Sequence, residues 1–367
     1  MGNIKRLFLQ GRLSRIRKLS MLLAISFALL SAGQLAAQSP AHVTVVKAGR
    51  LLDPRTGNVL SPAAVLIENG KIKEVGPPSQ VQTRTPANVK TIDLGNATLL
   101  PGLIDSHTHL FLDIIVPPEL EQQRHFNGLF APAMLLAIIE SPSKRVLMGA
   151  QSAREDLESG FTTVRNLGHS GIDGDTELRD AINAGRVPGP RILASGRKLI
   201  TRGSYVQNLN PALADAILEQ EFLLIDGADQ ARQAVRRNAF QNVDVIKVTA
   251  DENLTVAELT AVIDEAHREH LKVAVHAPDK VSIQTAIDAR ADSIEHGNEA
   301  TDAQLKQMRD KGIFLDLTPT FNDGFYLKIT EPSIVISPAS RADAASRNAR
   351  RKQNYDQLVQ RVLKSGV

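Results

Sequence analysis

The sequence of 367 residues contains no cysteine and no tryptophan, and aromatic residues make up only 4% of it. Without cysteine the chain has no disulfide framework, no thiolate nucleophile and no cysteine-ligated metal site. Any metal must therefore be held by histidine, by carboxylates or by a modified lysine. The length and the 43% apolar content are those of a globular protein with a sizeable buried core.

The N-terminal segment has the composition of a secretory signal peptide. Six basic residues and no acidic one fall within residues 1–20, and an apolar run at 21–30 and small residues up to Ala37 follow. The apolar run is short for a membrane span. We expect a signal peptide at 1–37 and a protein exported to the periplasm or secreted, touching a membrane only through this segment. A retained membrane anchor is the alternative.

The positive charge of the chain belongs to this segment. The whole sequence has 43 Lys and Arg against 40 Asp and Glu, a formal charge of +3. Removal of 1–37 takes away six basic residues and leaves 37 against 40, a charge of −3. A nucleic-acid partner is therefore not expected. We expect a small molecule or a dipeptide as substrate, and a homo-oligomer is compatible with the sequence.

Residues 42–98 predict a small β domain. Short apolar runs with strand character are separated by turn signals, and Asn69-Gly70 lies between two of them. Asn-Gly tolerates the positive φ angles of a type I′ turn, so residues 64–75 predict a β-hairpin. We interpret the region as the N-terminal part of a β-sandwich domain.

From residue 99 onward, strand-like and helix-like patterns alternate. The strand-like runs are 99–106, 162–166, 191–195, 243–248, 273–276, 293–296 and 313–318, and the helical patterns are 144–159, 176–184, 229–240, 255–270 and 301–311. Thr255 and Glu258 make a capping box, and Gly160, Gly185 and Gly312 stand at helix ends. This rhythm predicts an α/β fold with parallel strands.

The most consistent architecture is a (β/α)8 TIM-type barrel over residues 99–367. A doubly wound, nucleotide-binding sheet is the competing fold, but no glycine-rich phosphate fingerprint follows the first strand. Only seven strands are found, so the eighth strand is missing from the pattern. The segment at 337–364 is polar and prone to form a helix.

Chemistry-bearing residues stand at the ends of these strands. His107 and His109 close the first strand, and their spacing of two places both imidazoles on one face, where they can reach one ion. The runs at 273–276 and 293–296 end in His276 and His296. In a barrel, strand ends of this kind meet in the active site.

Lys247 lies on the inward face of the run at 243–248. A lysine inside a barrel is costly unless it is paired, neutral or modified. Condensed with carbon dioxide it becomes an anionic carbamate that can bridge two divalent cations. With the four histidines it makes five candidate metal ligands.

These motifs, in this order, resemble the amidohydrolase superfamily. The resemblance is to the branch of imidazolonepropionase-like enzymes and Xaa-Pro dipeptidases (prolidases), and it spans about residues 43–367. It rests on Pro101-Gly-Leu-Ile-Asp-Ser-His-Thr-His109, on 160–166, 178–185, 188–193 and 245–247, on Val275-His276-Ala277 and on Ile294-Glu-His296-Gly297.

The resemblance implies a metal-dependent hydrolase acting on a C–N bond of an amide or peptide. If this chain is such an enzyme, His107 and His109 would bind the more buried divalent metal, most simply zinc. His276 and His296 would bind the more exposed one. Carboxylated Lys247 would bridge the two, and a hydroxide shared by the ions would attack the carbonyl. A one-metal variant remains open.

The sequence departs from the family pattern after the third strand. The usual glycine-rich segment with His-Gly-Asp is replaced by residues 196–205, which include Arg197, Lys198, Arg202 and Tyr205. Arg202 and Tyr205 are candidate contacts for a substrate carboxylate, with a solvated basic loop as the alternative. His169, which follows the second strand, is a further candidate substrate contact.

A second departure concerns the catalytic residue. The family pattern needs an aspartate at the end of strand eight, and this residue is absent from the sequence; Asp316 falls within strand seven instead. We expect a C-terminally truncated amidohydrolase of low activity, whose first and seventh strands form open edges. The alternative is a degenerate, non-catalytic metal-binding protein.

Overall fold

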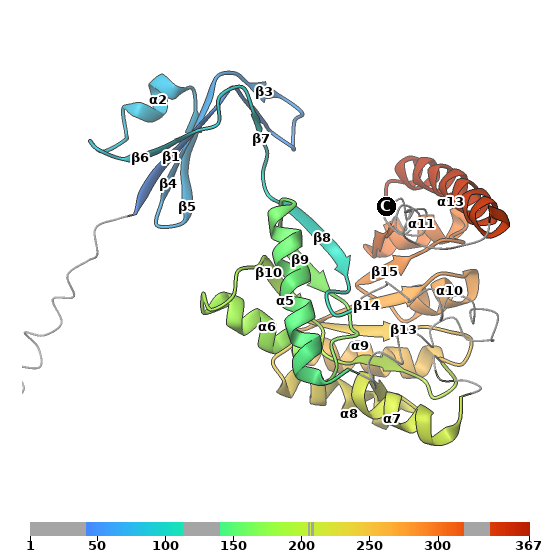
Figure 1. The fold of residues 1–367 in the computed structure, drawn as a ribbon. Helices are drawn as coiled ribbons and strands as arrows, with labels where there is room; N and C mark the ends of the chain where they lie inside the picture. Colours follow the sequence, from blue (N-terminus) through green and yellow to red (C-terminus); the bar gives the residue numbers. More distant parts are fainter. Residues whose placement is uncertain (1–41, 113–139, 205, 207–208, 319–337) are drawn as a thin grey trace, which may run out of the picture. The chain divides into compact units, whose positions relative to one another are not determined.

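The computed structural model describes residues 42–112, 140–204, 206, 209–318 and 338–367. The predicted signal peptide and its apolar run lie outside them. The chain divides into two compact units between Pro101 and Gly102, and both are drawn in Figure 1. Each unit is described by itself below.

The first unit contains two small β-sheets. One sheet has the order β5 (Lys71–Gly76), β4 (Ala63–Glu68), β1 (Val43–Ala48), β6 (Lys90–Asp93), and the other the order β3 (Val59–Leu60), β2 (Arg50–Leu52), β7 (Thr98–Leu99). A short helix, α2 (Pro78–Gln82), contributes Val81 to a core with Val45, Ala64 and Leu66.

The predicted hairpin in this unit is confirmed. Strands β4 and β5 pair antiparallel, with Glu68 opposite Lys71. The two residues between them, Asn69 and Gly70, have φ angles of 51° and 74°. These positive values are the ones that a type I′ turn requires and that Asn-Gly adopts at low cost.

The second unit contains parallel strands in two hydrogen-bonded groups. The first group has the order β10 (Arg191–Ala194), β9 (Phe161–Asn166), β8 (Leu103–Thr108). The second has the order β12 (Phe222–Leu224), β11 (Lys198–Ile200), β13 (Val245–Thr249), β14 (Lys272–Ala277), β15 (Ser293–His296), β16 (Phe314–Asp316). The predicted parallel α/β fold is therefore confirmed.

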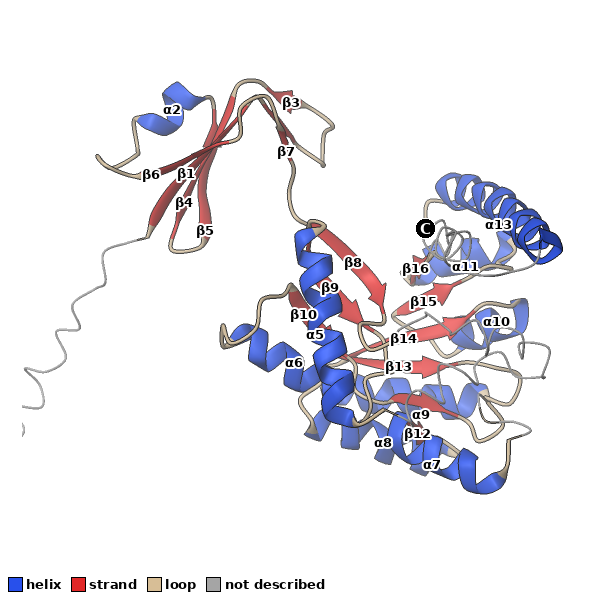
Figure 2. Cartoon of the chain, viewed as in Figure 1, coloured by secondary structure: helices blue, strands red, loops and turns tan. Residues whose placement is uncertain are grey.

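The helices of this unit lie between strands in the sequence, except for α13, which follows the last strand. They are α5 (Pro142–Glu158), α6 (Gly174–Asn183), α7 (Pro211–Glu221), α8 (Ala228–Phe240), α9 (Val256–Arg268), α10 (Lys280–Asp288), α11 (Asp302–Lys311) and α13 (Pro338–Ser365). Helices α8, α9, α10, α11 and α13 pack in sequence, each on the next, and Figure 2 shows them along the same sheet. The main apolar core lies between these helices and strands β13 to β15.

The predicted capping box at the start of α9 is present. The Thr255 side chain accepts from the Glu258 amide, and the Glu258 carboxylate accepts from the Thr255 amide. Gly312 ends α11 with a φ of 69°, a left-handed conformation that favours glycine.

The order of the strands excludes the doubly wound alternative. Strands β8 to β10 pair in sequential order in the first group, and β13 to β16 do so in the second, whereas a doubly wound sheet reverses its order. The outermost strands β8 and β16 also come within side-chain contact, because the Ser106 hydroxyl donates to the Asp316 carboxylate. The sheet therefore curls strongly.

The predicted first strand, 99–106, is wrong at its start. Its first residue belongs to β7, and β8 begins only at Leu103. Pro101 between them has no backbone N–H to donate to a neighbouring strand. The next residue, Gly102, has no room for a side chain, because a Cβ atom there would lie 2.1 Å from Thr162 Oγ1. The backbone therefore passes close to β9 just before β8 begins.

Four elements of the second unit were not predicted. Strands β11 and β12 are only three residues long, and α7 passes directly into β12 without a turn residue. Helix α10 had a recognisable signal, because Asp279 and Ser282 form a capping box at its start.

Strand β16 does contain Asp316, as predicted for strand seven.

Among the described residues, no helix combines the length and the apolar character that crossing a membrane requires.

Candidate metal centre

The histidine pair at the end of β8 is the first part of the site. His107 lies in β8 and His109 one residue beyond its end, and their ring centres are 5.3 Å apart. Both residues are partly buried. Beyond them the chain turns at Leu110 and Phe111, which pack into an apolar cluster beside α5 and α6. The strand end thus presents both rings to the same region.

Two more histidines reach this region from β14 and β15. These strands pair in parallel with Ala277 opposite His296, which brings the rings of His276 and His296 to 4.4 Å. The ring of His296 is also 4.9 Å from that of His107. The structure therefore brings together all four histidines that the strand ends predicted.

Lys247 lies in β13, whose five residues are all buried. Its side chain is 0% exposed, and its Nζ atom has no hydrogen-bond partner among the described residues. Burial lowers the pKa of Lys247 to about 7, against the opposing attraction of Glu295. A buried amine without a partner is costly as a cation, so the position favours a neutral or modified group.

The histidine rings are held in their neutral form. Burial, followed by the charge of Lys247, lowers the pKa of His296 to about 4. Burial is also the largest cause of the lowered pKa values of His107, His109 and His276. A neutral imidazole keeps a ring nitrogen free to bind a metal.

We call His107, His109, Lys247, His276 and His296 the five-residue cluster. Four neutral imidazoles around one unpartnered buried amine form a donor set of nitrogen ligands, to which carboxylation of the amine would add oxygen ligands. Such a set fits a divalent transition metal such as zinc. The five predicted ligands therefore lie in one region of the structure, and their donor atoms are of the kind that can hold a divalent metal.

Three charged residues, Glu295, Arg165 and Asp316, form a network next to the cluster. Glu295 on β15 is fully buried and lies 2.7 Å from His107 Nδ1. Arg165 on β9 donates to Glu295 at 2.9 Å and to the Ser106 carbonyl at 2.5 Å. Asp316 on β16 lies 3.7 Å from the same guanidinium.

This network was not identified from the sequence. One signal was available: in Ser293-Ile-Glu-His296 the glutamate falls on a buried strand that leads to a histidine. Its partners are 188 and 130 residues away in the sequence. Such contacts follow from the strand order and not from a local motif.

His169 lies next to the metal-centre histidines. Its ring is 5.0 Å from that of His109, and its Nε2 atom is 2.8 Å from Lys198 Nζ. Both side chains are buried, and burial lowers the pKa of each well below its ordinary value. Arg145 of α5 forms a buried ion pair with Glu221 and donates to the backbone carbonyl of His169 at 2.6 Å.

The other two predicted substrate contacts are placed differently. Arg202 is exposed and pairs with Asp215 at 3.4 Å and Asp226 at 3.9 Å. None of its described ion pairs joins it to the five-residue cluster. Tyr205 lies outside the described residues.

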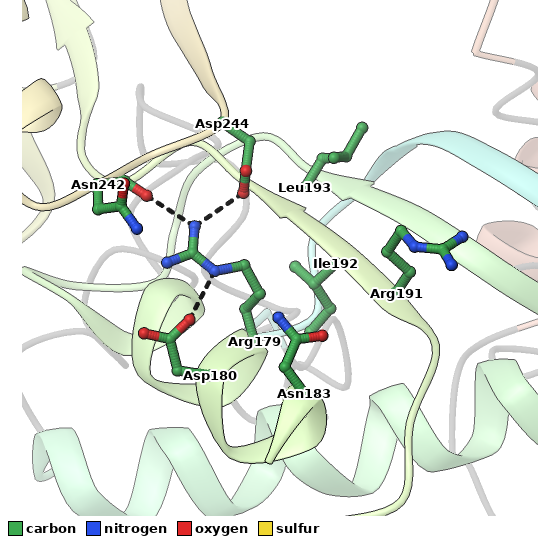
Figure 3. Close-up of a pocket in the computed structure, with 8 residues that line it drawn as sticks. All are labelled: Arg179, Asp180, Asn183, Arg191, Ile192, Leu193, Asn242 and Asp244. Carbon is green, nitrogen blue, oxygen red and sulfur yellow. Dashed lines mark hydrogen bonds and ion pairs between the residues drawn. The ribbon is translucent and has the colours of Figure 1, made fainter. Parts of the chain in front are cut away.

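A surface pocket of about 330 Å³ lies at the opposite ends of the strands. Arg179 crosses it and donates to the Asn242 carbonyl at 2.7 Å and to Asp244 at 2.8 Å (Figure 3). The pocket borders the start of β10 and the segment before β13. In α/β barrels this end of the strands serves stability, whereas chemistry gathers at the carboxyl ends.

Comparisons with known proteins identify the family of this chain. The model of the "Amidohydrolase family" matches residues 98–359. An ochratoxinase from Aspergillus niger is 28% identical over 307 residues, covering 76% of this chain and 59% of the relative. An imidazolonepropionase from Clostridium tetani is 23% identical over 283 residues, covering 72% and 64%. The chain thus spans less than two thirds of the length of these relatives.

Solved structures show the same fold. A Xaa-Pro dipeptidase with bound methionine has a TM-score of 0.67 at 24% identity, covering 89% of this chain and 77% of its own. The A. niger ochratoxinase also has a TM-score of 0.67 at 24% identity, covering 90% and 75%. Since the family model matches residues 98–359, which is most of the sequence, the chain belongs to the amidohydrolase family.

Proposed function

We propose that this protein is a metal-dependent hydrolase that cleaves the C–N bond of an amide or a peptide. The observation that carries the proposal is the five-residue cluster, in which four histidines with lowered pKa values lie near a buried lysine that has no hydrogen-bond partner among the described residues. The names of its relatives support the reaction class, since they include an ochratoxinase and an imidazolonepropionase, and a dipeptidase is among the similar structures.

The cluster divides into two sets of metal ligands. His107 and His109 would hold one zinc ion, His276 and His296 a second, and Lys247 would join the two after carboxylation. Bound zinc supplies Lewis-acid polarisation of a carbonyl and makes a water molecule more acidic.

Lys247 has the properties that carboxylation requires. Its amine attacks carbon dioxide only when neutral, and a pKa of about 7 makes a substantial neutral fraction available near neutral pH. The reaction forms one N–C bond, releases one proton and turns a potential cation into an anion. That charge change would also favour cation binding among the neutral histidines.

His169 and Lys198 are proposed to contribute to the substrate side of the site. His169 follows the carboxyl end of β9 and is in ring contact with His109, and Lys198, the first residue of β11, lies 2.8 Å from His169 Nε2. A dipeptide or an N-acyl amino acid presents a carboxylate, which can accept a hydrogen bond from the Lys198 amine in either protonation state.

The proposed architecture around this site is a (β/α)8 barrel with a small β-sandwich domain. Strands β8, β9, β10 with β11, and β13 to β16 would be the first seven barrel strands, and the contact between Ser106 and Asp316 supports the curvature. The described residues contain no eighth parallel strand after β16. The basic and apolar pattern of residues 1–37 supports export to the periplasm or secretion.

The proposal is tested by hydrolysis assays on the full-length chain loaded with zinc. Xaa-Pro dipeptides, other dipeptides and N-acyl amino acids are incubated with the protein, and the released amino acid is measured. We expect chelation, or the change His276→Ala, to reduce turnover at least 100-fold, whereas His42→Ala on the exposed surface leaves it unchanged.

Turnover that persists after chelation would refute the metal-dependent mechanism. Stoichiometric zinc binding without turnover of any substrate in the panel would instead support the alternative of a non-catalytic metal-binding protein.

A further inference from the structure

Glu295 makes contact with a proposed metal ligand without belonging to the ligand set. Its carboxylate is fully buried on β15, the strand that ends in His296. One oxygen, Oε2, lies 2.7 Å from Nδ1 of His107. The other, Oε1, accepts from Arg165 at 2.9 Å and from the Ser293 hydroxyl at 2.6 Å.

These contacts fix the orientation of the carboxylate. Arg165 is itself held in place because its Nε atom donates to the Ser106 carbonyl at 2.5 Å. Ser293 lies two residues before Glu295 on the same face of the strand. The carboxylate therefore receives hydrogen bonds from β8, β9 and β15, and each donor reaches it from a rigid element.

The partners of Glu295 determine which atom donates in its contact with His107. Its Oε1 atom accepts from a guanidinium and from a hydroxyl, and a carboxylate paired with a guanidinium acts as an acceptor. At 2.7 Å from Oε2, His107 Nδ1 is therefore the donor and carries the proton. The other ring nitrogen, Nε2, is left to bind a metal.

The distance also argues against an ion shared by His107 Nδ1 and Glu295. Two ligand atoms about 2 Å from a tetrahedral zinc ion lie roughly 3.4 Å apart. The observed 2.7 Å is a hydrogen-bond length instead. Possible ligand atoms of His107, Glu295 and Asp316 lie within 4.8 Å of one another. We interpret this group as a hydrogen-bond network beside the proposed metal centre and not as a separate metal site.

We propose that Glu295 is a positioning residue, which holds His107 in the Nδ1–H tautomer so that Nε2 faces the metal, and that Arg165 and Ser293 fix Glu295 for this task. The inference rests on the proposed metal centre. Carboxylates that accept from the second nitrogen of a histidine ligand raise its basicity and fix its ring, and their loss commonly weakens metal binding 10- to 100-fold.

The first test is histidine ¹⁵N NMR of the metal-free, full-length protein, which needs no variant at the network. We expect the His107 ring, assigned with His107→Gln, to carry its proton on Nδ1. A proton on Nε2 would overturn the proposal even if zinc bound tightly, so its failure is distinguishable from that of the proposed function.

The second test is zinc affinity measured by chelator competition in Glu295→Gln. We expect affinity to fall about 10- to 100-fold, with the His107 signals moving toward a mixture of tautomers. Glu265→Gln is the matched control, because Glu265 is also buried and paired with arginines, but on α9. Equal zinc affinities of the two variants, or an unchanged His107 tautomer in Glu295→Gln, would overturn the proposal.

Discussion

At the scale of single residues, the site consists of lysine and histidine side chains in buried positions, where burial disfavours their charged forms. Lys247 is fully enclosed and has no hydrogen-bond partner among the described residues, and the four histidines around it have lowered pKa values. A protein without a use for these groups would gain stability from apolar replacements. Their retention in one place is best explained by a metal that needs neutral nitrogen ligands.

Lys247 makes a testable contribution to the pH dependence of stability. In the metal-free protein its pKa is about 7 when folded and 10.5 when unfolded. Between these values the unfolded chain binds the proton and the folded chain does not, so stability rises with pH. We expect a gain of about 2 kcal/mol from this residue between pH 7 and pH 9, measured by urea unfolding.

The variants Lys247→Met and Lys71→Met provide the comparison. Lys247→Met should show a flatter rise over the same pH range, with the remainder coming from the buried Lys198, whose pKa is also lowered. Lys71 is exposed on β5, and its replacement should leave the slope as in the wild type. An identical slope in wild type and Lys247→Met would contradict the neutral state of this lysine.

The five ligands could be predicted from sequence because histidines at strand ends and a lysine in an apolar strand are conspicuous in their local context. Glu295 and Arg165 could not, since a charged residue in a strand has many ordinary explanations. Their function depends on partners more than a hundred residues away. Such partners become visible only when the strand order is known.

At the scale of secondary structure elements, one buried carboxylate joins α6 to the strands beside it. Asp175, in the first turn of α6, accepts from the Asn166 side chain at 3.1 Å and from the Ser195 and Gly196 amides at 3.0 and 3.1 Å. Those amides lie where β10 gives way to β11. The contact therefore fixes the turn that leads to Lys198.

Replacing Asp175 should destabilise this junction. Asp175→Ala removes the acceptor of two buried backbone amides, those of Ser195 and Gly196, each costing about 1–3 kcal/mol, so we expect a loss of at least about 2 kcal/mol in urea unfolding. Glu177→Ala, on the exposed face of the same helix, should change stability by less than about 0.5 kcal/mol. Similar values for the two variants would show that the junction does not depend on Asp175.

The elements themselves were predictable where the pattern was long. Strands β9, β13, β14 and β15 and helices α8, α9 and α11 lie within a few residues of their predicted positions. The short strands β11 and β12 were missed because three residues carry no periodicity. The start of β8 was misplaced because β7 and β8 are separated only by Leu100, Pro101 and Gly102.

At the scale of the whole molecule, the strand order turns distant sequence segments into one site. His107 and His296 are separated by almost 190 residues, yet their rings are 4.9 Å apart. The alternation of strands and helices predicted this arrangement, because parallel strands in sequential order bring their carboxyl ends together.

The most direct test of the account is the zinc content of the purified full-length chain, measured by inductively coupled plasma mass spectrometry. We predict one or two zinc ions per chain in the wild type and in His42→Ala, and loss of at least one ion in the double variant His107→Ala/His109→Ala. Less than half an equivalent of zinc in the wild type, or an unchanged zinc content in the double variant, would contradict the metal centre.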